Sequence, residues 1–381
     1  MTVTFAQGFR AAGVTAGLKA SGTPDLAVVI NDGPRFDAAG VFTSNRIQAA
    51  PVLWSRQVLT DGVLRAVVLN SGGANACTGP AGFADTHHTA EAAAQALAIG
   101  PIDVAVCSTG LIGERLDLTR LLAGLQVAIS SAHPDGGPSA AEAIMTTDTV
   151  AKTATAEAGY RVGGMAKGAG MLAPGMATML CVITTDAIVD AATLDTALRH
   201  ACARTFDRVD ADGCMSTNDT VIVMASGASG VPADDAFAAH LHAVCANLAR
   251  QLAADAEGAS KLIDIRVTNA ASENDAVAVG RAVARSALFK CAMFGEDPNW
   301  GRVLSAVGTT DAAFDPLHID VSINGVQVCR DSGVGDRRDL VDLSHRQVTV
   351  DIDLHAGTHR ATITTTDLTH EYVHENSAYS S

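Results

Sequence analysis

The feature that most constrains this 381-residue chain is a series of short strand-like apolar runs, each followed by a turn signal. In the first half these runs are Ala27–Ile30, Gly40–Thr43, Ala66–Leu69 and Val104–Cys107. Runs of this length predict strands, because a membrane-spanning helix needs roughly 20 apolar residues. The longest apolar runs, such as Met179–Ile183 and Val221–Ala225, are far shorter than that. We therefore expect sheets built from many short strands.

The remaining segments add helices and further strands. Helix formers and helical spacing of apolar residues predict helices over Thr89–Ile99, Ala140–Met145, Ala192–Thr205, Asp235–Ala256 and Ala276–Met293. Alternating patterns predict strands over Lys261–Ala270, His318–Ile323, Gln347–Leu354 and Arg360–Thr365, followed by a short tail, Tyr372–Ser381. The length suggests about two or three structural units. A mixed α/β sandwich fits this order better than a regular doubly wound sheet.

Charge and cysteine usage limit the class of protein. Lys+Arg 26 against Asp+Glu 41 gives a net charge of −15, which argues against nucleic-acid or anionic membrane surfaces as partners. We see no signal peptide, no C-x-x-C pair and no histidine spacing typical of a metal site, so we expect a soluble cytoplasmic protein with free thiols and no metal. Only five lysines occur, which makes each position informative: Lys19, Lys152, Lys167, Lys261 and Lys290.

A glycine-rich stretch, Gly163–Gly175, is followed by an apolar strand that opens at Thr178. It does not fit a phosphate loop, since Gly168 follows Lys167 and Pro174 prevents a helix, so a packed glycine turn is favoured. A threonine hydroxyl needs an adjacent base to act as a nucleophile. If the bond before Thr178 were broken, its new α-amine, with a pKa of roughly 7.7–8, could serve as that base. From the residues alone, an ordinary strand threonine is the stronger interpretation.

Three further segments carry polar groups beside turns. Thr109-Gly110 follows a strand and could aim a hydroxyl and a backbone N–H at a developing oxyanion. Thr146–Thr149 places hydroxyls beside a carboxylate, although helix capping explains this equally well. Glu257–Lys261 joins a predicted helix to a strand, where a C-cap glycine is the simpler explanation.

Taken together, the segments resemble the ornithine acetyltransferase (glutamate N-acetyltransferase) family of arginine biosynthesis. The central match is the run Lys167–Leu180, which is similar to the self-cleavage segment of that family. Supporting matches occur in the family's order at 70–79, 108–113, 143–149, 216–220, 257–261, 297–302 and 374–381. They extend over essentially the whole chain. Gly73 and Gly175 depart from the asparagine that many members carry there.

The resemblance implies self-cleavage between Ala177 and Thr178 into an α chain, 1–177, and a β chain, 178–381. The implied fold is α/β, a layered sandwich of mixed sheets and helices of the ornithine acetyltransferase type that both chains complete. Thr178 corresponds to the family's nucleophile, and Thr109 and Gly110 correspond to its oxyanion pair. The positions that match its substrate-binding residues are Thr146, Lys167, Thr178, Glu257, Asn376 and Ser381.

The implied reaction moves acetyl from N2-acetyl-L-ornithine to L-glutamate through acetyl-Thr178 and gives L-ornithine and N-acetyl-L-glutamate. One amide replaces another, so the resemblance implies no metal and no resident cofactor, while acetyl-CoA stays open as a co-substrate of a bifunctional enzyme. Family precedent also implies an assembly of two α and two β chains.

Two alternatives stay open. The first is a self-processed N-terminal-nucleophile amidase or aminopeptidase, in which water attacks the acyl-enzyme. The second is a non-catalytic protein that binds a small molecule, in which Gly163–Gly175 is only a packed turn.

Overall fold

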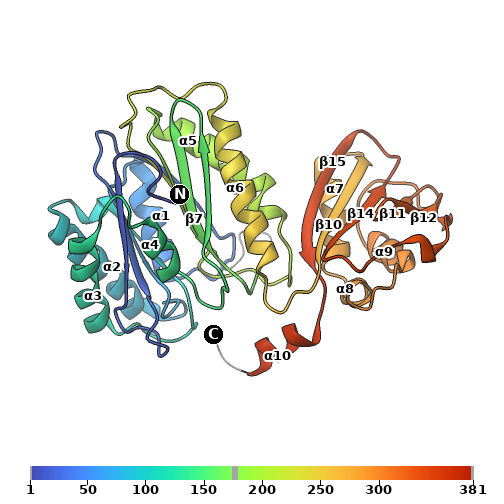
Figure 1. Cartoon of the computed structure of the whole chain (residues 1–381), viewed down its shortest axis with the longest axis horizontal. Helices are drawn as coiled ribbons and strands as arrows, with labels where there is room; N and C mark the ends of the chain where they lie inside the picture. The colour runs from blue at the N-terminus through green and yellow to red at the C-terminus, as the bar shows by residue number, and fades with distance from the viewer. Residues whose placement is uncertain (1, 174–178, 379–381) are drawn as a thin grey trace.

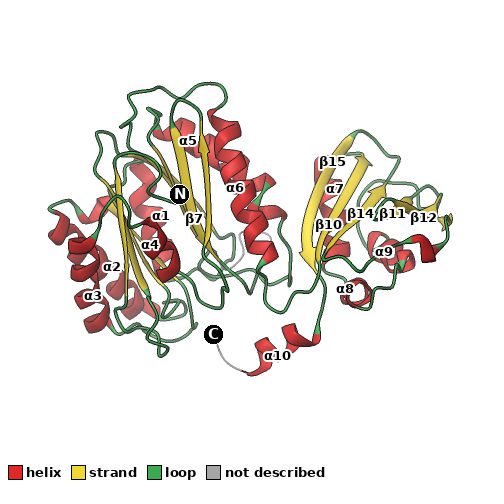
Figure 2. Cartoon of the chain, in the orientation of Figure 1, coloured by secondary structure: helices red, strands yellow, loops and turns green. Residues whose placement is uncertain are grey.

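Two mixed sheets packed face to face form the larger part of the protein (Figures 1 and 2). The structure is a computed structural model that describes residues 2–173 and 179–378. The first sheet has the order β1-β2-β4-β5, with β4 and β5 parallel and the other neighbours antiparallel. Its strands are β1 (Phe9–Val14), β2 (Leu26–Asn31), β4 (Ala66–Asn70) and β5 (Val104–Ser108).

The second sheet has the order β3-β9-β8-β7-β6, in which only β8 and β9 run parallel. Its strands are β3 (Asp37–Phe42), β6 (Lys152–Glu157), β7 (Arg161–Lys167), β8 (Leu180–Thr185) and β9 (Thr220–Ala225). Strands from both sides of the predicted cleavage position therefore belong to one sheet, in which β8 and β9 lie between β3 and β7.

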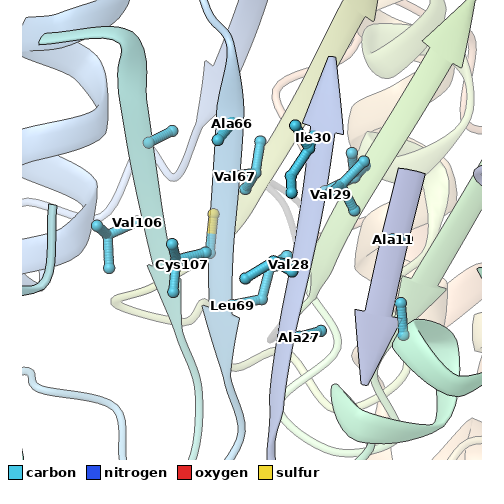
Figure 3. Close-up of a cluster of buried hydrophobic side chains, with 14 of the residues drawn as sticks. Ala11, Ala27, Val28, Val29, Ile30, Ala66, Val67, Leu69, Val106 and Cys107 are labelled. Carbon is cyan, nitrogen blue, oxygen red and sulfur yellow. The ribbon is translucent and has the colours of Figure 1, made fainter. Parts of the chain in front are cut away.

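Alternate side chains of a strand point to opposite faces of the sheet, so β8 contributes to the core on each side. Leu180 and Val182 of β8 join the core shared with the first sheet, whereas Cys181 and Ile183 face the opposite way. The shared core also holds the β2, β4 and β5 side chains drawn in Figure 3, such as Val67. Burial of both faces explains why these strands read as continuous apolar runs.

Helices cover both outer surfaces, which gives four layers in the order helix, sheet, sheet, helix. On the first sheet lie α1 (Ala50–Val58), α2 (Gly79–Leu97) and α3 (Leu118–Ser131), while α4 (Gly137–Ala143) packs beside β1. On the second lie α5 (Ala191–Arg204) and α6 (Phe237–Ala254). The predicted layered α/β sandwich is confirmed.

A second lobe with its own core follows the sandwich (Figure 1). Its sheet has the order β13-β12-β11-β14-β10-β15, and three helices cover one face. The strands are β10 (Leu262–Ala270), β11 (Asp320–Ile323), β12 (Val326–Arg330), β13 (Gly333–Val334), β14 (Gln347–Asp353) and β15 (His359–Thr366). The helices are α7 (Glu273–Ala284), α8 (Ala287–Phe294) and α9 (Trp300–Val307).

In two segments the observed secondary structure differs from the predicted one. The helix expected over Ala276–Met293 is two helices, because the Ser286 side chain caps a new start by accepting the Phe289 N–H. The expected tail is instead a helix for most of its length, α10 (His370–Ala378), which leaves the second lobe and returns toward the sandwich (Figure 1). None of the helices that the structure describes is long and apolar enough to cross a membrane.

The glycine-rich stretch is a strand in its first part, not a turn. Gly163 and Gly164 lie within β7, where a Cβ on Gly163 would lie 2.3 Å from the Thr2 carbonyl oxygen. Glycine is therefore needed for close packing of another backbone segment against the strand. β7 carries the chain to Lys167 at one end of the sheet.

Candidate active site

A cavity of about 870 Å³ opens where β5 and β7 end and β9 begins. Six of the residues predicted for the site line it, although they come from five separate segments of the chain. They are Thr109, Gly110, Thr146, Lys167, Glu257 and Asn376. The structure thus brings together residues up to 267 positions apart in the sequence, which the predicted helices and strands alone could not place.

Three predicted residues, Ala177, Thr178 and Ser381, lie outside the described residues. The chain is described again from Met179, whose backbone N–H donates to Asp219 Oδ1 at 3.0 Å. Asp219 is fully buried, and burial raises the pKa of its carboxyl well above the ordinary value. A buried carboxyl group therefore holds the peptide directly after the predicted nucleophile.

Thr109 and Gly110 follow β5 directly. The Thr109 N–H is already used, since it donates to the Asn70 carbonyl at 3.0 Å, and the Thr109 carbonyl accepts from the Gly73 N–H. Gly110 has φ +130°, and a Cβ there would lie 2.7 Å from the Gly73 nitrogen, so only glycine fits. Its own N–H has no hydrogen-bond acceptor among the described residues. The donors that remain for an oxyanion are the Thr109 hydroxyl and the Gly110 N–H.

A buried set of charges supports this wall of the cavity. Lys152 Nζ lies 2.6 Å from Asp148 Oδ1 and 2.5 Å from Asp255 Oδ2, while Lys167 Nζ lies 4.0 Å from Asp148 Oδ2. Burial alone would raise the pKa of Asp148, but Lys167, Lys152 and a hydrogen bond from the Thr146 N–H together lower it to about 2. Burial lowers the pKa of Lys167, and Asp148 opposes that shift. Asp148 is thus a carboxylate at neutral pH.

Glu257 and Asn376 form another part of the cavity lining. Asn376 Nδ2 donates to Glu257 Oε2 at 3.0 Å, and the Glu257 N–H donates to the Ala169 carbonyl at 2.9 Å. Gly258 has φ +61°, and a Cβ there would lie 2.2 Å from the Tyr372 nitrogen. This glycine therefore lets α10 approach closely enough to bring Asn376 to the cavity.

Several residues that line or support the cavity were not predicted from the sequence. Lys19 lines it and donates to the carbonyl oxygens of Pro24 and Met145 at 2.9 and 2.6 Å. Asn218 lines it as well, and its Nδ2 donates to the carbonyls of Ala74 and Ser108. The scarcity of lysine was a usable signal for Lys19, and the signal for Asn218 and Asp219 was their place in the 216–220 segment that resembles the family. The structure describes no group of three or more His, Cys, Asp or Glu that could hold a metal ion.

Comparison with known proteins places the whole chain in one family. Residues 10–381 match the model of the ArgJ family. "Arginine biosynthesis bifunctional protein ArgJ" of Streptomyces coelicolor is 63% identical over 100% of both chains, and that of Thermobifida fusca is 62% identical over 100% of both. A crystal structure of ornithine acetyltransferase complexed with ornithine from Mycobacterium tuberculosis is 60% identical, covering 45% of this chain and 94% of that chain with a TM-score of 0.43. The chain belongs to the ArgJ family.

Proposed function

We propose that this ArgJ-family chain transfers acetyl from N2-acetyl-L-ornithine to L-glutamate through an acetyl ester on Thr178. The observation that carries the proposal is the cavity, which gathers all six described residues that the family resemblance assigned to the reaction. The products are L-ornithine and N-acetyl-L-glutamate, an acyltransferase step of arginine biosynthesis. The word "bifunctional" in the relatives' names favours acetyl-CoA as a second acetyl donor.

The precursor cleaves itself between Ala177 and Thr178 in this proposal. The Thr178 hydroxyl attacks the Ala177 carbonyl, an N→O acyl shift gives an ester, and water releases the α chain, 1–177. The β chain, 178–381, then begins with a free α-amine beside the nucleophile. Sheet two supports this arrangement, because β7 and β8 pair along their whole length and hold the two chains together after cleavage.

In the transfer reaction the Thr178 Oγ attacks the acetyl carbonyl while the α-amine takes up the hydroxyl proton. The Thr109 hydroxyl and the Gly110 N–H then donate to the oxyanion of the tetrahedral intermediate. Ornithine departs with its amine reprotonated, and the amine of glutamate attacks the ester in the reverse sequence. Water must be excluded meanwhile, or the ester hydrolyses.

Substrate recognition follows from the charges around the cavity. The Lys167 ammonium suits the α-carboxylate that both substrates share. Glu257 suits the side-chain amine of ornithine, and the Asn376 amide beside it can donate to a carboxylate or accept from an amine. Thr146 and Ser381 complete the proposed substrate contacts. We also propose an assembly of two α and two β chains and a cytoplasmic location.

The experiment that tests the proposal uses the purified chain, N-acetylornithine and glutamate. Intact-mass spectrometry should detect two chains that meet between residues 177 and 178, and a single uncut chain would favour the non-catalytic alternative. Consumption of N-acetylornithine should depend on glutamate and yield N-acetylglutamate. Equal consumption with and without glutamate would favour the amidase alternative instead.

A further inference from the structure

A second cavity, of about 460 Å³, lies between the sandwich and the second lobe, apart from the candidate active site. Its walls come from the end of α5 and the turn after it, from α6, from β10 and β15, and from the start of α7. In Figure 1, α6 is the helix of the sandwich that faces β10 and β15. Its charged and titratable lining residues are Arg204, Arg208, His242, Arg266, Glu273 and Arg360.

The charge of this cavity is opposite to that of the whole chain, whose net charge is −15. Four arginines line it, and Glu273 is its one acidic residue, which both Arg204 and Arg208 contact at 3.1 and 2.8 Å. Arg208 Nη1 is buried and has no hydrogen-bond partner in the described part of the chain. Buried polar atoms in proteins are generally paired, so this one indicates a missing acceptor.

The second-lobe side of the cavity adds two more guanidinium groups. Arg266 has a distant ion pair, 3.8 Å from Asp351, and about half of its side chain is exposed. Arg360 makes no ion pair with any described residue. Both guanidinium groups are therefore available to an anion.

The backbone of β15 supplies a further donor. The Thr364 carbonyl accepts from the Asp210 N–H at 2.9 Å, so the outer edge of β15 faces the sandwich at that residue. Backbone groups of alternate residues in a strand face the same side, so the Thr362 N–H also faces this open edge. Thr362 and Thr268 both line the cavity, and the Thr268 hydroxyl already donates to the Ile352 carbonyl at 3.4 Å.

We propose that this cavity binds the phosphate groups of a nucleotide. Guanidinium forks, hydroxyls and a free strand-edge N–H are the donors that phosphate oxygens accept from in proteins. The volume is within the range of about 300–1,000 Å³ that holds drug-sized ligands, so a nucleoside can accompany the phosphates. Phosphate groups attached to a nucleoside occur both in a free nucleotide and in the 3′-phospho-ADP portion of a coenzyme A thioester.

The test is calorimetric titration of the purified enzyme with ADP and with inorganic pyrophosphate at constant ionic strength. The double variant Arg266→Gln/Arg360→Gln should bind both probes at least about tenfold more weakly, because two charge-assisted contacts are lost. Arg266→Lys/Arg360→Lys should lose less, since the charges remain. The matched control is Arg337→Gln, which removes an exposed arginine paired with Asp339 on another part of the second lobe.

Two results would overturn the proposal. One is the absence of saturable binding to the wild-type enzyme, and the other is an equal affinity in the double variant and in Arg337→Gln. An unchanged melting temperature without ligand shows that the variants are folded. Since binding is measured directly, this outcome is independent of whether the proposed acetyl transfer takes place.

Kinetics distinguish the two sources of the nucleotide. If the site holds a coenzyme A thioester, the double variant raises KM for acetyl-CoA and leaves KM for N-acetylornithine unchanged. If it holds a free nucleotide, ADP affinity falls while KM for acetyl-CoA stays the same. The kinetic comparison rests on the proposed acetyl-CoA activity, whereas the calorimetric test does not.

Discussion

Lys167 Nζ lies 3.2 Å from Thr109 Oγ1, so a buried ammonium group donates a hydrogen bond to the hydroxyl that we assign to the oxyanion site. This contact occupies an acceptor position of the hydroxyl oxygen and leaves its proton free to be donated elsewhere. A charged donor also polarises the O–H bond, which strengthens the bond that the hydroxyl itself donates. In the proposed mechanism the lysine thus prepares Thr109 to stabilise negative charge.

Replacing Thr109 tests that role. Thr109→Ala should reduce kcat by about 10²–10³-fold, as loss of one oxyanion donor typically does. KM for N-acetylornithine should change much less, because the donor acts mainly on charge in the transition state. Thr109→Ser keeps the hydroxyl and is the matched control. Steady-state kinetics on both variants measure the effect, and near-normal turnover in Thr109→Ala would assign the oxyanion site elsewhere.

Replacing Thr178 tests self-cleavage. Thr178→Ala should remain a single chain of 38.9 kDa on denaturing electrophoresis, because no hydroxyl is present to attack the Ala177 carbonyl. Thr178→Ser retains a hydroxyl and should still be cleaved. Two chains in the alanine variant would show that another group cuts the precursor.

The lowered pKa of Asp148 predicts that the stability of the protein depends on pH. Folding lowers the pKa of Asp148 from 3.8 to about 2, so its contribution is fully present above the unfolded value and is lost as the pH falls toward 2. A pKa shift of this size adds about 2 kcal/mol to the free energy of unfolding at neutral pH. The urea midpoint of wild type should therefore exceed that of Asp148→Asn at pH 7, and the gap should shrink by pH 3. A gap independent of pH would mean that the carboxylate charge is not what stabilises this region.

Gly258 controls the approach of α10. Gly258→Ala should displace the helix, since its Cβ would lie 2.2 Å from the Tyr372 nitrogen. We expect a raised KM for N-acetylornithine and unchanged self-cleavage, because cleavage requires the Ala177–Thr178 region and not the substrate contacts of α10. Gly230→Ala is the matched control: Gly230 has a similar φ of +71° but no atom within 4 Å of a new Cβ. Equal KM values in the two variants would contradict a role for the position of α10.

Asn376 tests the contribution of α10 to the site directly. Asn376→Ala should raise KM for glutamate and N-acetylornithine and should increase ester hydrolysis relative to transfer, because a polar wall of the cavity is lost. Ser377→Ala is the control, since among the described residues that hydroxyl hydrogen-bonds only to the His374 carbonyl within α10. Parallel assays of ornithine release and N-acetylglutamate formation give the ratio. An unchanged ratio in Asn376→Ala would exclude the residue from the site.

The sequence alone determined the layered α/β class, because strand alternation and helical periodicity depend on neighbouring residues. Through a family resemblance it also predicted which residues form the site, and three of them, Lys167, Glu257 and Asn376, line one cavity. Local pattern was less reliable where packing decides the outcome, as for Gly163 and Gly164. Both lie within β7, which pairs with β6 and β8, and a backbone segment packs against Gly163 while side chains of α6 pack against Gly164.

Only the tertiary structure decided which distant charges meet. Asp148, Lys152 and Asp255 form one buried network although about 100 residues separate its ends, and Arg208 and Arg360 line one cavity from two lobes. No local propensity specifies such pairs, because their energy arises from burial and from Coulomb interactions that exist only after the sheets and helices have packed. The polar junction between the sandwich and the second lobe results from that packing, and the short-range pattern, which predicted strands and helices of the second lobe, does not specify it.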